Sequence, residues 1–248
     1  MFSKLTMVLS LVVLVSFVAS PALAAPGDSW SLGGDFSITN GNPNQVGDGS
    51  WEYHTGTGDN LMDLADTDWY VAENPPNIGW HHSTQTGNPW VHVVKATDDY
   101  TNHNPAGCTT GCPQLNAGDV GGHGTFAVYF RNRSGSPATY NLSASGYNTR
   151  NDEQNMHRSG NLDITWTGGS LNLNMAGDAN DNINGTRATG SASAITLADG
   201  GAIKAVMNYN DWSGLTLDVN QVPEPTSVLL MLVGGLGLMW SAGRRPRR

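Results

Sequence analysis

Residues 161–175 read NLDITWTGGSLNLNM, and apolar and polar residues alternate on both sides of two glycines. The apolar positions are Leu162, Ile164, Trp166, Leu171, Leu173 and Met175. A period of two is typical of a β-strand with one buried face. The pair Gly168-Gly169 favours a tight turn between two such strands. The stretch therefore predicts a β-hairpin.

The same alternation recurs along the chain, between turns rich in Gly, Asn, Ser and Thr. Further strands are predicted at residues 34–39, 50–55, 89–96, 124–133, 138–147, 191–197, 202–209 and 214–219. The longest irregular stretches are residues 97–123 and 176–186. About ten short strands without a helical period favour packed antiparallel sheets. We predict an all-β fold, an antiparallel two-sheet β-sandwich of jelly-roll-like architecture, over residues 25–221.

The N-terminal residues 1–24 have the pattern of a signal peptide, which forms a helix during export. Lys4 precedes an apolar stretch, and Ala22-Leu23-Ala24 supplies the small residues that signal peptidase recognises. An uncleaved anchor helix is the alternative, but the apolar stretch is short for that role. We therefore predict an exported protein.

The C-terminal residues 226–242 are nearly all apolar or glycine, and as a helix they would extend roughly 25 Å. That length suffices for a transmembrane helix in a thin bilayer. The four arginines that follow are Arg244, Arg245, Arg247 and Arg248. Arginines at the end of a span stay in the cytoplasm, so this helix would anchor the protein in the inner membrane with the large domain outside.

The tail as a whole, residues 222–248, resembles the PEP-CTERM sorting signal. It joins Val222-Pro223-Glu224-Pro225, an apolar span and an arginine cluster in that order. The resemblance implies recognition by an exosortase, cleavage near Pro-Glu-Pro and delivery to the cell surface or the extracellular matrix of a biofilm. A plain membrane anchor without processing is the alternative.

A second resemblance covers parts of the large domain. Asp35-Phe36-Ser37, Asn42-Pro43-Asn44 and Trp51-Glu52-Tyr53 are similar to the opening of many PEP-CTERM ectodomains. Residues 196–225 are similar to their end, in which a hairpin and a last strand lead into the sorting signal. The resemblance implies a jelly-roll sandwich and assigns no activity.

Composition excludes one class of partner. Between residue 25 and Glu224, 21 acidic residues face seven basic residues, a balance of −14. Nucleic acids require a basic surface, so we expect no nucleic-acid partner. The two cysteines, Cys108 and Cys112, would enter an oxidising compartment, and a disulfide between them is expected. Neither a zinc site nor haem attachment fits their surroundings.

Two ligand hypotheses follow from the remaining side chains. Asp178, Asn180 and Asn182 alternate as in calcium loops, although the expected glycine and closing glutamate are missing. The alternative is a polar surface turn, so no cofactor is expected other than this calcium candidate. Trp80 and Trp90 are candidates for stacking on sugar rings of an extracellular polysaccharide, whereas tryptophans that only fill the core are the alternative.

No motif for nucleophilic or metal-assisted catalysis occurs in the sequence. We therefore expect a protein without catalytic residues, which binds carbohydrate or matrix or has a structural role in the cell envelope. The alternative is a hydrolase that acts on extracellular polysaccharide, which would need two carboxylates facing each other in a cleft.

Overall fold

The computed structural model describes residues 28–56, 58–69, 77–83, 91–95, 118–148, 160–175, 187–208 and 212–223. The predicted signal helix, the apolar span with its arginines, the two cysteines and the calcium candidates lie outside these residues. In the described part of the chain, no helix is both long and apolar enough to cross a membrane.

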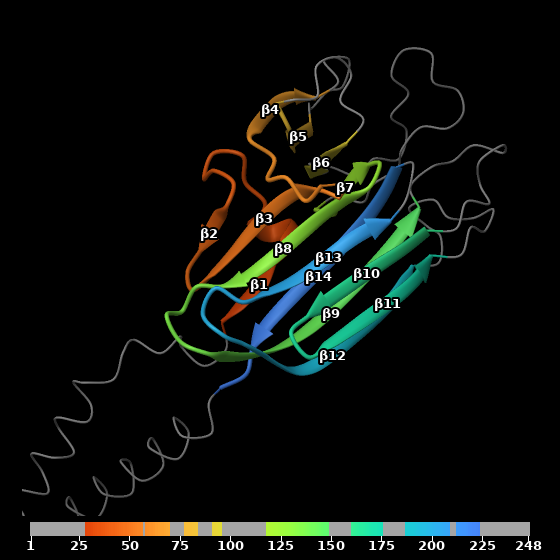
Figure 1. The fold of residues 1–248 in the computed structure, drawn as a ribbon. Coiled ribbons are helices and arrows are strands. Elements are labelled where there is room, and N and C mark those ends of the chain that lie inside the picture. The colour runs from red at the N-terminus through yellow and green to blue at the C-terminus, as the bar shows by residue number, and fades with distance from the viewer. Residues whose placement is uncertain are drawn as a thin grey trace, which may run out of the picture.

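One sheet has eight strands and is antiparallel throughout (Figure 1). Its order is β12 (Ala188–Leu197), β9 (Ala138–Asn148), β14 (Trp212–Gln221), β7 (Val120–His123), β6 (His92–Lys95), β5 (Asn77–His81) and β4 (Leu64–Trp69). The eighth strand, β1 (Ser29–Ser31), pairs with the last residues of β14. Thus β14, which leads into the C-terminal tail, is an interior strand of this sheet.

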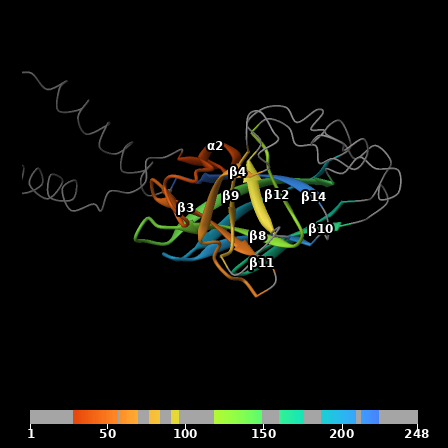
Figure 2. The ribbon, with the colours of Figure 1, turned by 90° about the horizontal axis from the view of Figure 1, so that it is seen from above.

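The second sheet has six strands, which also pair antiparallel. Its order is β11 (Gly169–Met175), β10 (Gly160–Trp166), β13 (Ala202–Asn208), β8 (Phe126–Asn132), β3 (Gly49–Thr55) and β2 (Asn44–Val46). The one helix of the described residues, α2 (Leu32–Asp35), follows β1 directly and contacts β14; Figure 2 shows it from above. The prediction of an all-β chain with two antiparallel sheets in a sandwich-like arrangement is confirmed.

The core lies between the sheets and is built from the alternating apolar side chains. Phe126, Val128 and Phe130 of β8 are fully buried, as are the inward residues of β14. Aromatic rings join the layers, because Phe130 packs against Trp30 at 5.1 Å and against Tyr140 at 5.4 Å. Aromatic pairs at these centroid distances add to the free energy of burial.

The predicted hairpin at residues 161–175 is present as β10 and β11. Leu162 pairs with Leu173 and Trp166 with Gly169, which leaves Thr167 and Gly168 as the turn. Gly168 has φ of 95°, a conformation that side-chain-bearing residues rarely adopt. The glycine therefore fixes the register that buries Leu162 and Leu173.

Two local predictions were wrong. Residues 34–39 do not form a strand, because Asp35 closes a helical turn by accepting from the backbone N–H of Ser31 at 3.0 Å and from Trp51 Nε1 at 3.0 Å. Strands β12 and β13 do not form a hairpin, since β12 pairs with β9 and β13 pairs with β8 and β10. Their turn instead passes from one sheet to the other. Within the stretch predicted to be irregular, β7 adds a glycine-rich strand that shows no alternation.

The two ends of the sandwich differ in their connections. Four short turns lie at one end, at residues 47–48, 133–137, 167–168 and 198–201. The chain enters at Asp28 and leaves at Val222 at this same end, where Gln221 N donates to Asp28 O at 2.9 Å. We call it the tether end. Strands β9, β11 and β13 end, and β10, β12 and β14 begin, at the opposite end (Figure 1).

Candidate functional site

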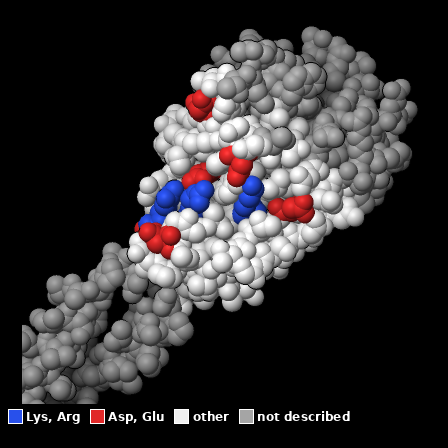
Figure 3. Space-filling view, viewed as in Figure 1, with Lys and Arg blue, Asp and Glu red and all other residues white. Residues whose placement is uncertain are grey.

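A charged cluster occupies the outer face of the six-stranded sheet (Figure 3). Its buried member is Glu52 on β3, which is 4% exposed. Glu52 Oε1 accepts from Arg131 Nε at 2.6 Å and from an Arg133 guanidinium N–H at 3.2 Å. Glu52 Oε2 lies 3.2 Å from His54 Nε2. Burial alone would raise the pKa of Glu52, but the hydrogen bonds from His54 and Arg131 outweigh it and lower the pKa to about 2.

The neighbouring part of the cluster joins three further residues. The Tyr129 hydroxyl donates to Asp59 Oδ1 at 2.6 Å, and Lys204 Nζ lies 3.2 Å from Asp59 Oδ2. Lys204 Nζ also lies 5.1 Å from the centre of the Tyr129 ring. Burial lowers the pKa of Lys204, but its hydrogen bonds with Tyr129 and Asp59 raise it by more. Each of these charges has a partner within the cluster, so the cluster ties β3, β8 and β13 together and offers no unpaired ligand group.

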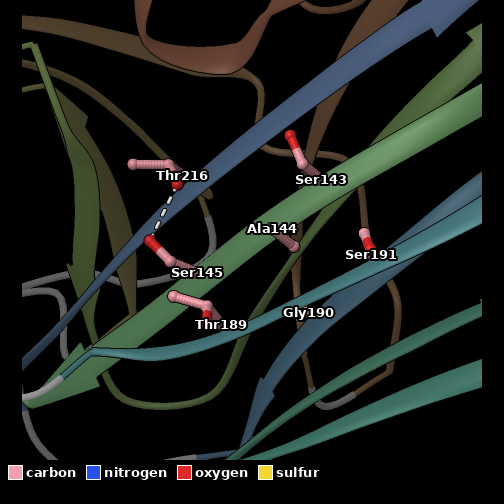
Figure 4. A pocket seen from close by; sticks show the side chains of 7 residues that line it. All are labelled: Ser143, Ala144, Ser145, Thr189, Gly190, Ser191 and Thr216. Carbon is pink, nitrogen blue, oxygen red and sulfur yellow. Dashed lines mark hydrogen bonds between the residues drawn. The ribbon is translucent and has the colours of Figure 1, made fainter.

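Two shallow depressions that share Thr216 lie on the outer face of the eight-stranded sheet, on the other side of the molecule, and together we call them the groove. Its first part is a cavity of about 520 Å³ between β12, β9 and β14. Hydroxyl groups dominate its lining, which consists of Ser143, Ser145, Thr189, Ser191 and Thr216 together with Ala144 and Gly190. Figure 4 shows these side chains on three neighbouring strands, with Ser145 Oγ hydrogen-bonded to Thr216 Oγ1 at 2.8 Å. The floor therefore presents many hydrogen-bonding groups and no long side chain.

The second part of the groove is a cavity of about 380 Å³ that shares Thr216 with the first. It lies between α2, β6 and β14, and it contains the charged residues Lys95, Asp119 and Asp218. The groove thus passes from neutral hydroxyls to a charged end.

Asp119 is held in place by two neighbours. Its Oδ2 accepts from the Tyr147 hydroxyl at 2.5 Å and from an Arg187 guanidinium N–H at 2.7 Å. The Arg187 guanidinium lies 4.2 Å from the centre of the Tyr147 ring, and the ring covers Gly214. A Cβ at position 214 would lie 2.4 Å from Tyr147 Cζ, so only glycine lets the ring lie flat against β14. Two hydrogen bonds, from Tyr147 and Arg187, therefore hold the Asp119 carboxylate in place at the charged end of the groove.

The residues predicted from the sequence lie elsewhere. Trp80 is 5% exposed, its Nε1 donates to Ser37 O at 3.0 Å, and its ring stacks on Tyr53 at 6.5 Å. A core position leaves neither face of this ring open to a sugar, which corrects the binding role predicted for Trp80. Trp90, Cys108 and Cys112 lie outside the described residues, as do the calcium candidates Asp178, Asn180 and Asn182. No group of three or more His, Cys, Asp or Glu side chains in the described part of the chain could hold a metal ion.

The groove residues were not predicted. Their serines and threonines occupy the polar positions of the alternating strands and look like ordinary solvent-facing residues. The signal that could have revealed them is the near absence of long polar side chains from SASGY at 143–147 and TGSAS at 189–193.

The described residues also include the start of the tail. Strand β14 ends at Gln221, and the N–H of the next residue, Val222, still donates to Thr139 O at 2.8 Å. Pro223 is exposed. Glu224, Pro225 and the arginines lie outside the described residues. No residue therefore separates the strand from the first residue of the Val-Pro-Glu-Pro sequence.

Comparison with known proteins identifies this tail. Residues 221–248 match the PEP-CTERM protein-sorting motif. The chain carries a PEP-CTERM motif. The motif indicates an exported protein with a membrane-anchored sorting signal, which an exosortase processes for delivery to the cell surface.

Two solved structures are distantly similar to part of this chain. One is the PRD1 vertex protein P5, with 8% identity, a TM-score of 0.26 and coverage of 38% of this chain and 65% of that chain. Another is the Podospora anserina GH26-CBM35 β-(1,4)-mannanase, with 17% identity, a TM-score of 0.27 and coverage of 54% of this chain and 28% of that chain. The chain spans less than two thirds of either structure. A comparison with curated proteins gives no sequence match.

Proposed function

We propose that this PEP-CTERM protein is a non-catalytic module that binds polysaccharide of the extracellular matrix in the groove of the eight-stranded sheet. The observation that carries the proposal is the lining of the groove, in which five serine and threonine hydroxyls lead to Lys95, Asp119 and Asp218. Sugar hydroxyls both donate and accept hydrogen bonds, and so do serine and threonine hydroxyls. Destination to the cell surface supports a matrix ligand.

The groove favours hydrogen bonding over aromatic stacking. None of the described residues that line it is aromatic, and Arg187 already lies over the ring of Tyr147, which is hydrogen-bonded to Asp119. The ligand would therefore be a polar chain lying along the sheet rather than a single ring held between aromatic faces. Two acidic residues, Asp119 and Asp218, line the charged end beside Lys95, and they favour a neutral or amine-bearing sugar over an acidic one, because like charges repel.

Affinity electrophoresis of the mature protein in gels that contain neutral, amine-bearing or acidic polysaccharides tests this proposal. The double variant Thr189→Val with Thr216→Val removes two groove hydroxyls, while valine keeps the side-chain shape and favours strands. We expect binding to weaken about tenfold or more, since each hydrogen bond contributes about 1 kcal/mol. Thr165→Val, an exposed threonine of β10, is the matched control and should bind normally. Failure of the unaltered protein to bind any of these polymers would reject the proposal.

A hydrolase is the second candidate, because Asp119 and Asp218 line the same cavity. Glycoside hydrolysis needs two carboxylates that flank the scissile bond. Against it, Asp119 already accepts from Arg187 and Tyr147. Release of reducing ends from a bound polysaccharide, abolished by Asp218→Asn, would favour the hydrolase. Binding without such release would favour the module.

A further inference from the structure

The end of the folded domain and the start of the apolar span are very close in sequence. Val222 is hydrogen-bonded to Thr139, and the apolar span begins at Thr226. A chain extends at most about 3.6 Å per residue, so Pro223 lies within about 11 Å of Thr226. The headgroup layer on each side of a bilayer is about 5–8 Å thick. No room for a flexible linker remains between them.

We propose that, before the tail is removed, the tether end of the sandwich faces the phospholipid headgroup surface of the membrane. The proposal rests on the membrane-anchored PEP-CTERM motif. It assigns the facing surface to the turns at residues 47–48, 133–137, 167–168 and 198–201. The chain entry at Asp28 is part of the same surface, because Asp28 O accepts from Gln221 N. The described chain therefore begins and ends at the surface that would face the bilayer.

The tether end is a rigid surface, and Asn132 is its central residue. Asn132 is fully buried, and its Nδ2 donates to Ser136 O at 2.7 Å and to Leu197 O at 3.2 Å. Its backbone N–H donates to Gly201 O at 3.0 Å. These bonds lock the 133–137 turn to the 198–201 turn. Both turns are therefore fixed to the sandwich. The domain cannot move away from the membrane by unfolding these turns while the strands stay paired.

Charge indicates that the tail, and not lipid affinity, holds this end at the membrane. The charged residues of the turns and of the chain entry are Asp28, Asp48, Arg133 and Asp199. Anionic lipid surfaces attract basic segments, whereas this set carries more acidic than basic groups. The contact should therefore end when the tail is cut.

Fluorescence quenching in vesicles tests the proposal. Full-length precursor from cells without exosortase is placed in vesicles that contain anionic phospholipid and a short-range quencher attached to headgroups. A genetically encoded fluorescent amino acid replaces either Ser136 at the tether end or Asn60 in the β3–β4 connection, and both cysteines stay in place. Strand β9, with 11 residues, spans about 36 Å between the two ends. We expect quenching at position 136 and none at position 60.

A spacer and a released form complete the experiment. A flexible Gly/Ser insert of about 20 residues between Val222 and Pro223 adds a mean reach of about 25 Å. We expect this insert, or removal of the tail, to abolish quenching at position 136. Equal quenching at both positions in the unmodified precursor would overturn the proposal. Quenching at position 136 that persists with the insert would also overturn it, because the short connection would then not hold the surface in place.

Discussion

Arg131 Nε donates to Glu52 Oε1 at 2.6 Å across the β8–β3 pair, and Glu52 has a side chain that is only 6% exposed. Strand β8 is an interior strand of the six-stranded sheet and β3 lies between it and the edge strand β2, on the sheet opposite to the groove. The pair therefore allows the stability of the sandwich to be changed without touching a residue proposed to bind polysaccharide.

The lowered pKa of Glu52 predicts acid sensitivity. A carboxyl group with a pKa of 4.5 when unfolded and about 2 when folded stabilises the fold above pH 4.5, and this contribution is lost as pH falls toward 2. The difference corresponds to about 3 kcal/mol at neutral pH. We expect Glu52→Gln to lower the unfolding free energy at pH 7 by about this amount and to flatten its decline between pH 4.5 and 2. Urea titrations over this pH range measure both, with the exposed Asp199→Asn as control. An unchanged slope in Glu52→Gln would contradict the prediction.

Tyr129→Phe should weaken the cluster by removing its hydrogen bond to Asp59. Because Asp59 has a half-exposed side chain, we expect a loss of about 1 kcal/mol in unfolding free energy. A double-mutant cycle with Asp59→Asn isolates the interaction. Purely additive effects of the two substitutions would show that the two side chains do not interact in solution.

Gly168→Ala tests the hairpin turn. No atom lies within 4 Å of the Cβ position, so the whole effect comes from φ of 95°. We expect a loss of about 1–2 kcal/mol, the approximate cost of a left-handed conformation for a residue with a side chain. Thr167→Ala, in the same exposed turn, should have a much smaller effect. Denaturant midpoints of the two variants provide the comparison, and equal midpoints would rule out this account of the turn.

Gly214→Ala should displace the Tyr147 ring, because the new methyl group would lie 2.4 Å from Tyr147 Cζ. Displacement breaks the Tyr147–Asp119 hydrogen bond at the charged end of the groove. We expect a loss of about 1–3 kcal/mol in stability and weaker polysaccharide binding. Tyr147→Phe keeps the ring and removes only the hydroxyl, so it should bind better than Gly214→Ala. The reverse order in affinity electrophoresis would contradict the role given to the ring.

Processing by exosortase should depend on the distance between the fold and the cleavage motif. The Val222–Thr139 hydrogen bond holds the chain immediately before Pro223 in the sheet, and a peptidase acts on chain that has opened locally. We expect the spacer between Val222 and Pro223 to increase the rate at which precursor is converted to mature protein. Pulse-chase mass analysis measures that rate. Slower or unchanged conversion would indicate that the folded domain does not limit access.

The alternation of apolar and polar residues was enough to predict where individual strands lie, but not which strands pair. The alternation of Leu162 and Ile164 was sufficient to predict β10, and that of Leu215 and Leu217 was sufficient for β14, because a period of two depends only on neighbouring residues. The partner of each strand is a long-range property. The turn at residues 198–201 looked like a hairpin turn, but Asn132, more than 60 residues away, accommodates it between the sheets.

Which serines and threonines meet in the groove could not be predicted for the same reason. Ser145 and Thr216 are 71 residues apart and become neighbours only when β9 pairs with β14. Trp80 shows the opposite error, because an aromatic residue beside polar loop residues can serve either the core or a ligand, and the sequence does not show which face is covered. The PEP-CTERM motif could be predicted fully, since its parts are contiguous in the chain.

The two ends of the sandwich differ in their turns, and this difference makes the domain suitable for displaying inserted peptides. Four tight turns lie beside Val222, whereas β9 and β11 end, and β10 and β12 begin, at the opposite end of the sandwich. Foreign peptides inserted between β9 and β10 or between β11 and β12 would therefore be attached at the end of the sandwich opposite the proposed membrane-facing surface.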